Sequence, residues 1–90
     1  ENKRLLLGES LPKTDETALR RIVAGWDGVT DVVDFRTVYF GPERVVVMAD
    51  VAFDPELETD EIDDRISAIE AALKGGRTGV RKVYIEPETA

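Results

Sequence analysis

Cysteine and histidine are both absent from the chain. Their absence excludes disulfides, thiolate or imidazole zinc sites, a cysteine nucleophile and a Ser-His-Asp relay. Long apolar runs are missing too: the longest, such as Leu5 to Leu7 and Val45 to Ala49, are far too short to span a membrane as a helix. We also find no phosphate-binding glycine motif and no nucleophile beside a base, so we do not expect an enzyme.

Positive charge is scarce. The 90 residues include 12 lysines and arginines against 19 aspartates and glutamates, which gives a formal net charge of −7. A surface of this sign repels phosphate backbones, so we expect no nucleic-acid partner. Apolar residues make up 42% and charged residues 34% of the chain, as is typical of one folded globular domain.

The beginning of the chain differs from the rest. It starts at Glu1 with neither an initiator methionine nor a signal peptide, so we expect it to be part of a longer protein. Residues 1–13 show no periodicity and contain Gly8 and Pro12, which indicates a lead-in or linker. We therefore place the folded domain at residues 14–90.

Apolar residues at helical spacing indicate two helices. The first is predicted from about Asp15 to Ala24 with Thr14 as its N-cap, and the second begins at the N-cap Thr59 and ends at Gly75 and Gly76. Their apolar positions are Ala18, Leu19, Ile22, Val23 and Trp26 in the first helix and Ile62, Ile66, Ile69 and Leu73 in the second.

Three segments alternate as strands do. Residues 29–40 and 45–53 form a predicted hairpin around the loop 41–43, and a last strand at 80–86 is expected to stop at Pro87. One face of this sheet is the better candidate for the core. It would carry Val33, Phe35, Thr37, Tyr39, Val45, Val47, Ala49, Val51, Phe53, Val83 and Ile85.

The element order is therefore α-β-β-α-β. Both amphipathic helices need an apolar surface to cover, and one face of the sheet supplies it. The second helix would connect two parallel strands through a right-handed crossover. The predicted fold is α+β, an open-faced ferredoxin-like sandwich with two helices on one face of a three-stranded mixed sheet.

The opposite sheet face also carries apolar residues, namely Val38, Phe40, Val46 and Met48. Such a face is normally covered, which predicts that these four residues form a homodimer interface. The alternative is that the strand register is shifted by one residue, which would place them in the core instead.

Acidic residues cluster in two places. Residues 54–64 hold seven carboxylates, including Asp60 and Asp63, but lack the glycine of a calcium-binding EF-hand loop. The sequence favours a solvated loop and first helical turn over an ion site there.

The second place is the outer sheet face. Asp34, Asp50 and Glu86 would all point outward and could bind a hard divalent cation. Arg36 and Lys82 share this face, so cross-strand ion pairs are the favoured alternative.

Four segments carry a resemblance to a known family: LLLGESLP, VVDFRTVYFGP, LETDEI and KVYIEPE. From about Arg4 to Pro87 the chain resembles the cytoplasmic C-terminal domain of a cation diffusion facilitator (cation efflux) transporter, and it looks most similar to the zinc transporter 9-like subgroup. The resemblance implies a homodimer at the cytoplasmic face of the membrane. It also implies a transmembrane domain in the same polypeptide, which makes residues 1–13 a juxtamembrane linker.

The resemblance also implies what this chain has lost. Family members that bind metal in this domain carry histidines, and only the acidic residue before the final proline is kept in kind, as Glu86. The implied role is a dimerisation and regulatory domain of a Zn-type efflux transporter with no resident cofactor. We expect Asp50, Glu86, Asp60 and Asp63 to bind divalent cations only weakly. The alternative function is a free-standing ferredoxin-like sensor of a small molecule or a metal. The lost histidine positions are Val33, Ala49 or Asp50, Asp63 and Tyr84.

Overall fold

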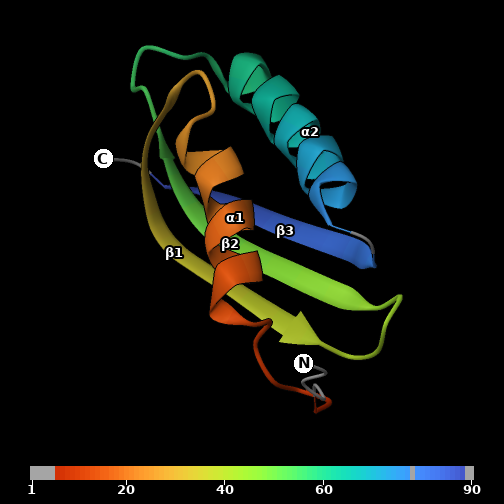
Figure 1. Cartoon of the computed structure of the whole chain (residues 1–90). Helices are drawn as coiled ribbons and strands as arrows, with labels where there is room; N and C mark the ends of the chain where they lie inside the picture. The colour runs from red at the N-terminus through yellow and green to blue at the C-terminus, as the bar shows by residue number, and fades with distance from the viewer. Residues whose placement is uncertain (1–5, 78, 89–90) are drawn as a thin grey trace.

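The computed structural model describes residues 6–77 and 79–88, so the first five residues of the predicted lead-in and the last two of the predicted domain lie outside it. The element order is α-β-β-α-β, as predicted (Figure 1). The elements are α1 (Lys13–Ala24), β1 (Val29–Tyr39), β2 (Val45–Phe53), α2 (Thr59–Gly76) and β3 (Val80–Glu88).

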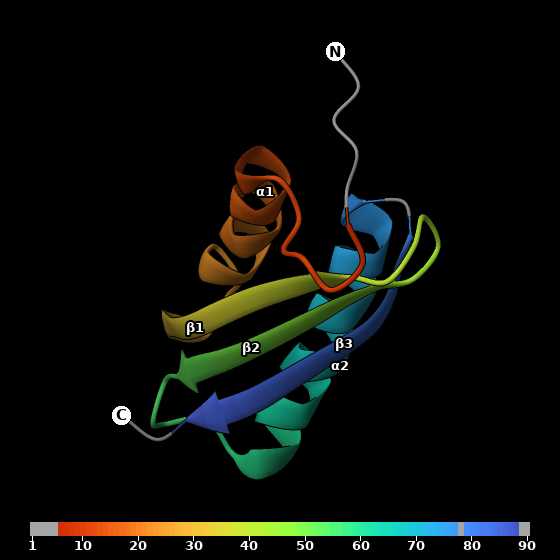
Figure 2. The same cartoon turned by 90° about the horizontal axis from the view of Figure 1, so that it is seen from below.

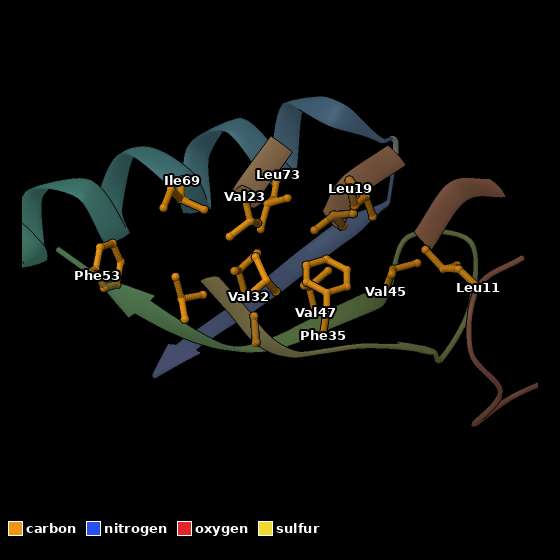
Figure 3. Packing of buried hydrophobic residues seen from close by; sticks show 14 residues of the cluster. Leu11, Leu19, Val23, Val32, Phe35, Val45, Val47, Phe53, Ile69 and Leu73 are labelled. Atoms are coloured by element: carbon orange, nitrogen blue, oxygen red, sulfur yellow. The ribbon is translucent and has the colours of Figure 1, made fainter. Parts of the chain in front are cut away.

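The three strands form one mixed sheet in the order β1-β2-β3 (Figure 2). β1 and β2 are antiparallel, whereas α2 returns the chain so that β3 runs parallel to β2. Both helices cover the same face of the sheet (Figure 3), which confirms the predicted ferredoxin-like sandwich. Within residues 6–77 and 79–88, neither helix combines the length and apolarity that crossing a bilayer requires.

The core fills the space between the helices and the sheet (Figure 3). Leu19 and Val23 point down from α1. Ile69 and Leu73 do the same from α2, and neither has any exposed surface. Trp26 and the partly buried isoleucines of both helices pack around this centre. The sheet contributes Val32, Phe35, Val45, Val47, Ala49, Val51, Phe53, Val80 and Val83.

Both helices begin differently from the prediction. Thr14 is inside α1, which starts after Pro12, and the Pro12 carbonyl accepts the Glu16 N–H at 2.9 Å. Thr59 is the first residue of α2 rather than its cap. The N-cap is Glu58, whose N–H donates to the Glu61 carboxylate at 2.8 Å, so the backward reach of Glu61 fixes where the helix starts.

The predicted inward position of Val33 is wrong. Val32 pairs with Val51 while Asp34 pairs with Asp50, so β1 carries one more residue than β2 between these pairs. This bulge reverses the alternation of β1 on its N-terminal side. Val32 is therefore buried, and Val33 is 56% exposed.

The last strand also continues beyond the predicted stop at Pro87. β3 extends to Glu88, with Pro87 opposite Val51 and Glu88 opposite Ala52. A proline is tolerated here because β3 is an edge strand, where a missing N–H need not break a ladder on both sides. The extension adds a second outward carboxylate two residues after Glu86.

The segment before α1 is attached to the sheet. Gly8 N–H donates to the Tyr39 carbonyl at 2.7 Å, and Tyr39 N–H donates to the Glu9 carbonyl at 2.8 Å. Leu11 is only 4% exposed, and its N–H donates to the hydroxyl of buried Thr37. That hydroxyl donates in turn to the Glu16 carboxylate at 2.6 Å, which ties the segment, β1 and α1 together.

Candidate functional site

The first candidate surface is the outer face of the sheet, opposite the helices. Val38 pairs with Val46, and Met48 lies between Arg36 on β1 and Tyr84 on β3. The side chains of Val38 and Val46 are half-buried, Met48 is 37% exposed and Phe40 is 50% exposed. The four predicted interface residues therefore point outward, and the alternative register that would place them in the core is excluded.

Sequence reasoning missed one member of this surface. Tyr84 is 56% exposed and lies beside Met48, so its ring extends the apolar strip onto β3. The alternation of β3 predicts this outward position, but the sequence analysis did not count Tyr84 among the interface residues. We call Val38, Phe40, Val46, Met48 and Tyr84 the outer apolar strip.

The second candidate is a carboxylate cluster at the far end of the same face. Asp50 pairs with Glu86 across β2 and β3, and one oxygen from each of Asp50, Glu86 and Glu88 lies within 4.8 Å of the others. An open depression of about 440 Å³ adjoins it, lined by Tyr84 and by Glu70 of α2 among others. The structure thus joins two of the predicted ligands and adds Glu88, which the shorter predicted strand had left out.

The remaining acidic predictions lie elsewhere. Asp34 is opposite Asp50, but its carboxylate accepts from the Arg36 guanidinium at 3.0 Å. The predicted cross-strand charge pairing therefore occurs as a pair within β1, and the ion pairs found in the described ranges do not include Lys82. Asp60 and Asp63 are exposed on the first turns of α2, and in the described part of the chain neither joins a three-carboxylate group.

The donor set of the cluster decides which ions fit it. Asp50, Glu86 and Glu88 offer only carboxylate oxygens, which suit hard cations such as Ca²⁺ and Mg²⁺. Tight zinc sites use imidazole or thiolate ligands, and the chain contains no histidine or cysteine. A tight zinc site therefore does not fit these residues.

Comparison with known proteins gives a consistent picture. Residues 11–90 match the family described as the cytoplasmic domain of cation efflux proteins, whose model is named for a dimer. No curated protein matches the chain.

Solved structures of MamM CTD share the fold. A single-residue variant has a TM-score of 0.78 at 18% identity, covering 87% of this chain and 94% of its own. A nickel form of another variant has a TM-score of 0.78 at 18% identity, with 88% and 99% covered. A copper form has a TM-score of 0.77 at 18% identity, with 87% and 85% covered.

Proposed function

Because the chain belongs to the family of cytoplasmic domains of cation efflux proteins, we propose that it is the dimerisation and regulatory domain of a divalent-cation efflux transporter. In this proposal a transmembrane domain precedes it in the same polypeptide, and the domain lies at the cytoplasmic face of the membrane. A Zn-type cargo and the zinc transporter 9-like subgroup belong to the same proposal. An upstream coding sequence with several apolar spans of about 20 residues would support the attachment.

The observation that carries the proposal is the outer apolar strip. It occupies the sheet face that no helix covers, and three of its five residues, Phe40, Met48 and Tyr84, are at least 37% exposed. A second copy of the chain can bury it through a two-fold interface, in which each residue contributes twice. The isolated domain would dimerise weakly, since a membrane anchor normally raises the local concentration.

Sedimentation equilibrium tests this directly. We expect the isolated domain to self-associate at high micromolar concentration, and Met48→Glu to raise the dimer Kd by about tenfold or more, because two carboxylates would face each other across the axis. The matched control is Ser67→Glu, which adds the same charge on an exposed position of α2. Monomer at every concentration, or equal weakening by both variants, would contradict the proposed interface.

Regulation by metal is proposed to be weak. The MamM CTD structures include zinc, nickel and copper forms by their titles. In this chain the carboxylates of Asp50, Glu86 and Glu88 lie together on the outer face, and Tyr84 lines the depression beside them. A neutral phenol is a poor ligand, so hard cations bound loosely by carboxylates are what we expect.

Calorimetry with Zn²⁺ separates weak from tight binding. We expect no stoichiometric site of low-micromolar or tighter Kd. A site of that affinity, abolished by Asp50→Ala or Glu86→Ala, would contradict the proposal. The carboxylate cluster would then bind Zn²⁺ tightly enough to regulate the domain. Sedimentation with and without Zn²⁺ gives the functional readout, and we expect equal dimer affinities.

A further inference from the structure

Positive charge is segregated along this acidic chain. Residues 74–84 contain four lysines and arginines and no acidic residue, whereas residues 46–73 contain nine acidic residues and one arginine. Because α2 and β3 are joined at residues 77–79, the basic stretch is located where α2 ends and β3 begins. The acidic stretch instead holds most of β2, the loop that follows it and most of α2.

The basic stretch lies beside the β1–β2 hairpin. Val45 N–H donates to the Gly79 carbonyl at 2.9 Å. Gly79 has a φ of +94°, and a Cβ there would lie 2.1 Å from the Pro42 carbonyl oxygen, so the start of β3 is pressed against the hairpin loop. Figure 2 shows the hairpin, the start of β3 and the segment before α1 together at one end of the sheet.

Three cations at this hairpin end share a groove. Arg44, Arg81 and Lys82 line an open hollow of about 530 Å³ together with Phe40 and Val46 of the outer apolar strip. All three side chains are exposed, and none of them forms a hydrogen bond or ion pair within residues 6–77 and 79–88. Other arginines of the domain are engaged: Arg36 with Asp34, Arg65 with Asp27, and Arg77 with Asp15.

Exposed leucines lie at the same end. Leu6 and Leu7 are 58% and 73% exposed in a turn closed by Glu9 N–H donating to the Leu6 carbonyl at 3.2 Å. The hydrogen bonds of Gly8 and Glu9 to Tyr39 hold this turn against the last residue of β1. Exposed apolar and cationic side chains are therefore both located at the hairpin end of the sheet (Figure 2).

This combination matches the chemistry of a lipid surface. Cations attract phosphate headgroups, while leucine side chains enter the boundary between headgroups and acyl chains. A nucleic acid or phosphopeptide would use the cations but leave the leucines in water. Charges are screened beyond roughly 10 Å at ordinary ionic strength, so the acidic end, far along a molecule 45 Å long, opposes contact only weakly.

We propose that the hairpin end, formed by Arg44, Arg81, Lys82, Leu6 and Leu7, is a membrane-contact surface that recognises anionic phospholipid headgroups. The proposal rests on the proposed function only in that a transmembrane domain would keep this end near lipid, and it does not require dimerisation.

The membrane-contact surface is also compatible with a dimer. Two chains related by a two-fold axis that runs along the strands would both direct their hairpin ends toward the membrane. Met48 and Tyr84 would remain available to the partner.

Vesicle co-sedimentation of the isolated chain at about 0.1 M salt, where charges far along the molecule are screened, tests the proposal. The probes are phosphatidylcholine vesicles with about one-third phosphatidylglycerol, pure phosphatidylcholine vesicles, and a single-stranded DNA oligonucleotide. We expect binding only to the anionic vesicles, weakening as salt is added. Arg44→Gln with Lys82→Gln should reduce the partition coefficient on the order of tenfold or more, since each basic residue near an anionic surface contributes a several-fold factor.

The matched control removes the same charge elsewhere. Arg21→Gln with Arg36→Gln changes two exposed cations outside the groove and should reduce binding about threefold at most. Leu7→Ser should weaken binding to anionic vesicles while leaving its salt dependence in place. Equal losses in the two charge variants, equal binding to neutral vesicles, binding to the oligonucleotide alone, or no binding at all would each overturn the proposal. Sedimentation without lipid reports on the dimer separately, so either idea can fail alone.

Discussion

The two faces of the sheet are made from the same three strands but meet different surroundings. On the inner face, Val45, Val47 and Val51 of β2 have no exposed surface, because α1 and α2 cover them. On the outer face, the residues between them, such as Val46 and Met48, remain partly or largely exposed. Adjacent residues of one strand therefore have different roles. The inner residues stabilise the domain, and the outer residues are available to contact a partner.

The same contrast holds for polar groups. The one buried polar side chain, in the part of the chain that is described, is Thr37 on the inner face, and its hydroxyl both accepts from Leu11 N–H and donates to Glu16. The carboxylates of Asp50, Glu86 and Glu88 on the outer face lie close together, and among the described residues no side chain or backbone N–H donates to them. A polar group needs a hydrogen-bond partner within the protein where water is excluded, but not where water or an ion can reach it.

The largest expected effect breaks the inner face. Ile69→Ala removes a side chain of α2 with no exposed surface and leaves a cavity against β2, so the free energy of unfolding should fall by about 3 kcal/mol. Urea denaturation followed by circular dichroism measures this. Ser67→Ala on the exposed side of the same helix is the control and should change stability by less than about 0.5 kcal/mol.

Neighbouring residues of β2 sharpen the comparison between faces. Val47→Ala should cost roughly 2.5 kcal/mol of unfolding free energy, since its side chain is fully buried. Val46→Ala, one position away on the outer face, should cost less than about 0.5 kcal/mol in the monomer but weaken self-association. Denaturation at low protein concentration and sedimentation separate the two effects. Equal losses of monomer stability would show that the outer face is not a free surface.

A smaller effect is expected at Thr37. Thr37→Val keeps the shape of the side chain but leaves the Leu11 N–H without its acceptor, at a cost of about 1.5 kcal/mol. It also removes one of the two hydrogen bonds that the Glu16 carboxylate accepts from residue 37, while the bond from the backbone N–H remains. Hydrogen exchange at the Leu11 amide should accelerate in parallel. Thr30→Val is the control, because Thr30 is exposed and water can replace its bond to the Ala52 carbonyl. Unchanged exchange at Leu11 would show that the segment before α1 is held by other contacts.

Most of the fold could be predicted because it depends on periodicity. Helical spacing identified α1 and α2, and strict alternation identified both faces of β2 and the outward position of Tyr84. The bulge at Val33 and the second register shift between Val29 and Asp31 could not be found this way, since the side-chain types along β1 do not mark which residue is inserted. Only the pairing with β2 reveals that the two sides are out of phase.

The site was predicted less completely for related reasons. Asp50 and Glu86 were paired by register, but Glu88 was lost because proline was expected to end β3, whereas an edge strand tolerates it. The attachment of Gly8 and Glu9 to Tyr39 is made by backbone hydrogen bonds, which leave no trace in side-chain composition. The groove around Arg44 and Lys82 depends on the crossover that places β3 beside β2, which is a tertiary feature.

The smallest expected effect is a change in unfolding free energy that has opposite signs for two kinds of carboxylate. Asp50→Asn removes one of the three like charges of the carboxylate cluster, so it should raise the free energy of unfolding by about 0.5 kcal/mol at low salt. Asp60→Asn removes a charge that favours the N-terminus of α2 and should lower it by about 0.5 kcal/mol. Thermal unfolding with and without millimolar Ca²⁺ adds a second readout, because the cation should raise the Tm of the parent chain slightly and that of Asp50→Asn less. A loss of stability in Asp50→Asn would mean that its carboxylate is held by the fold, and the cluster would then be a structural feature rather than a loose cation site.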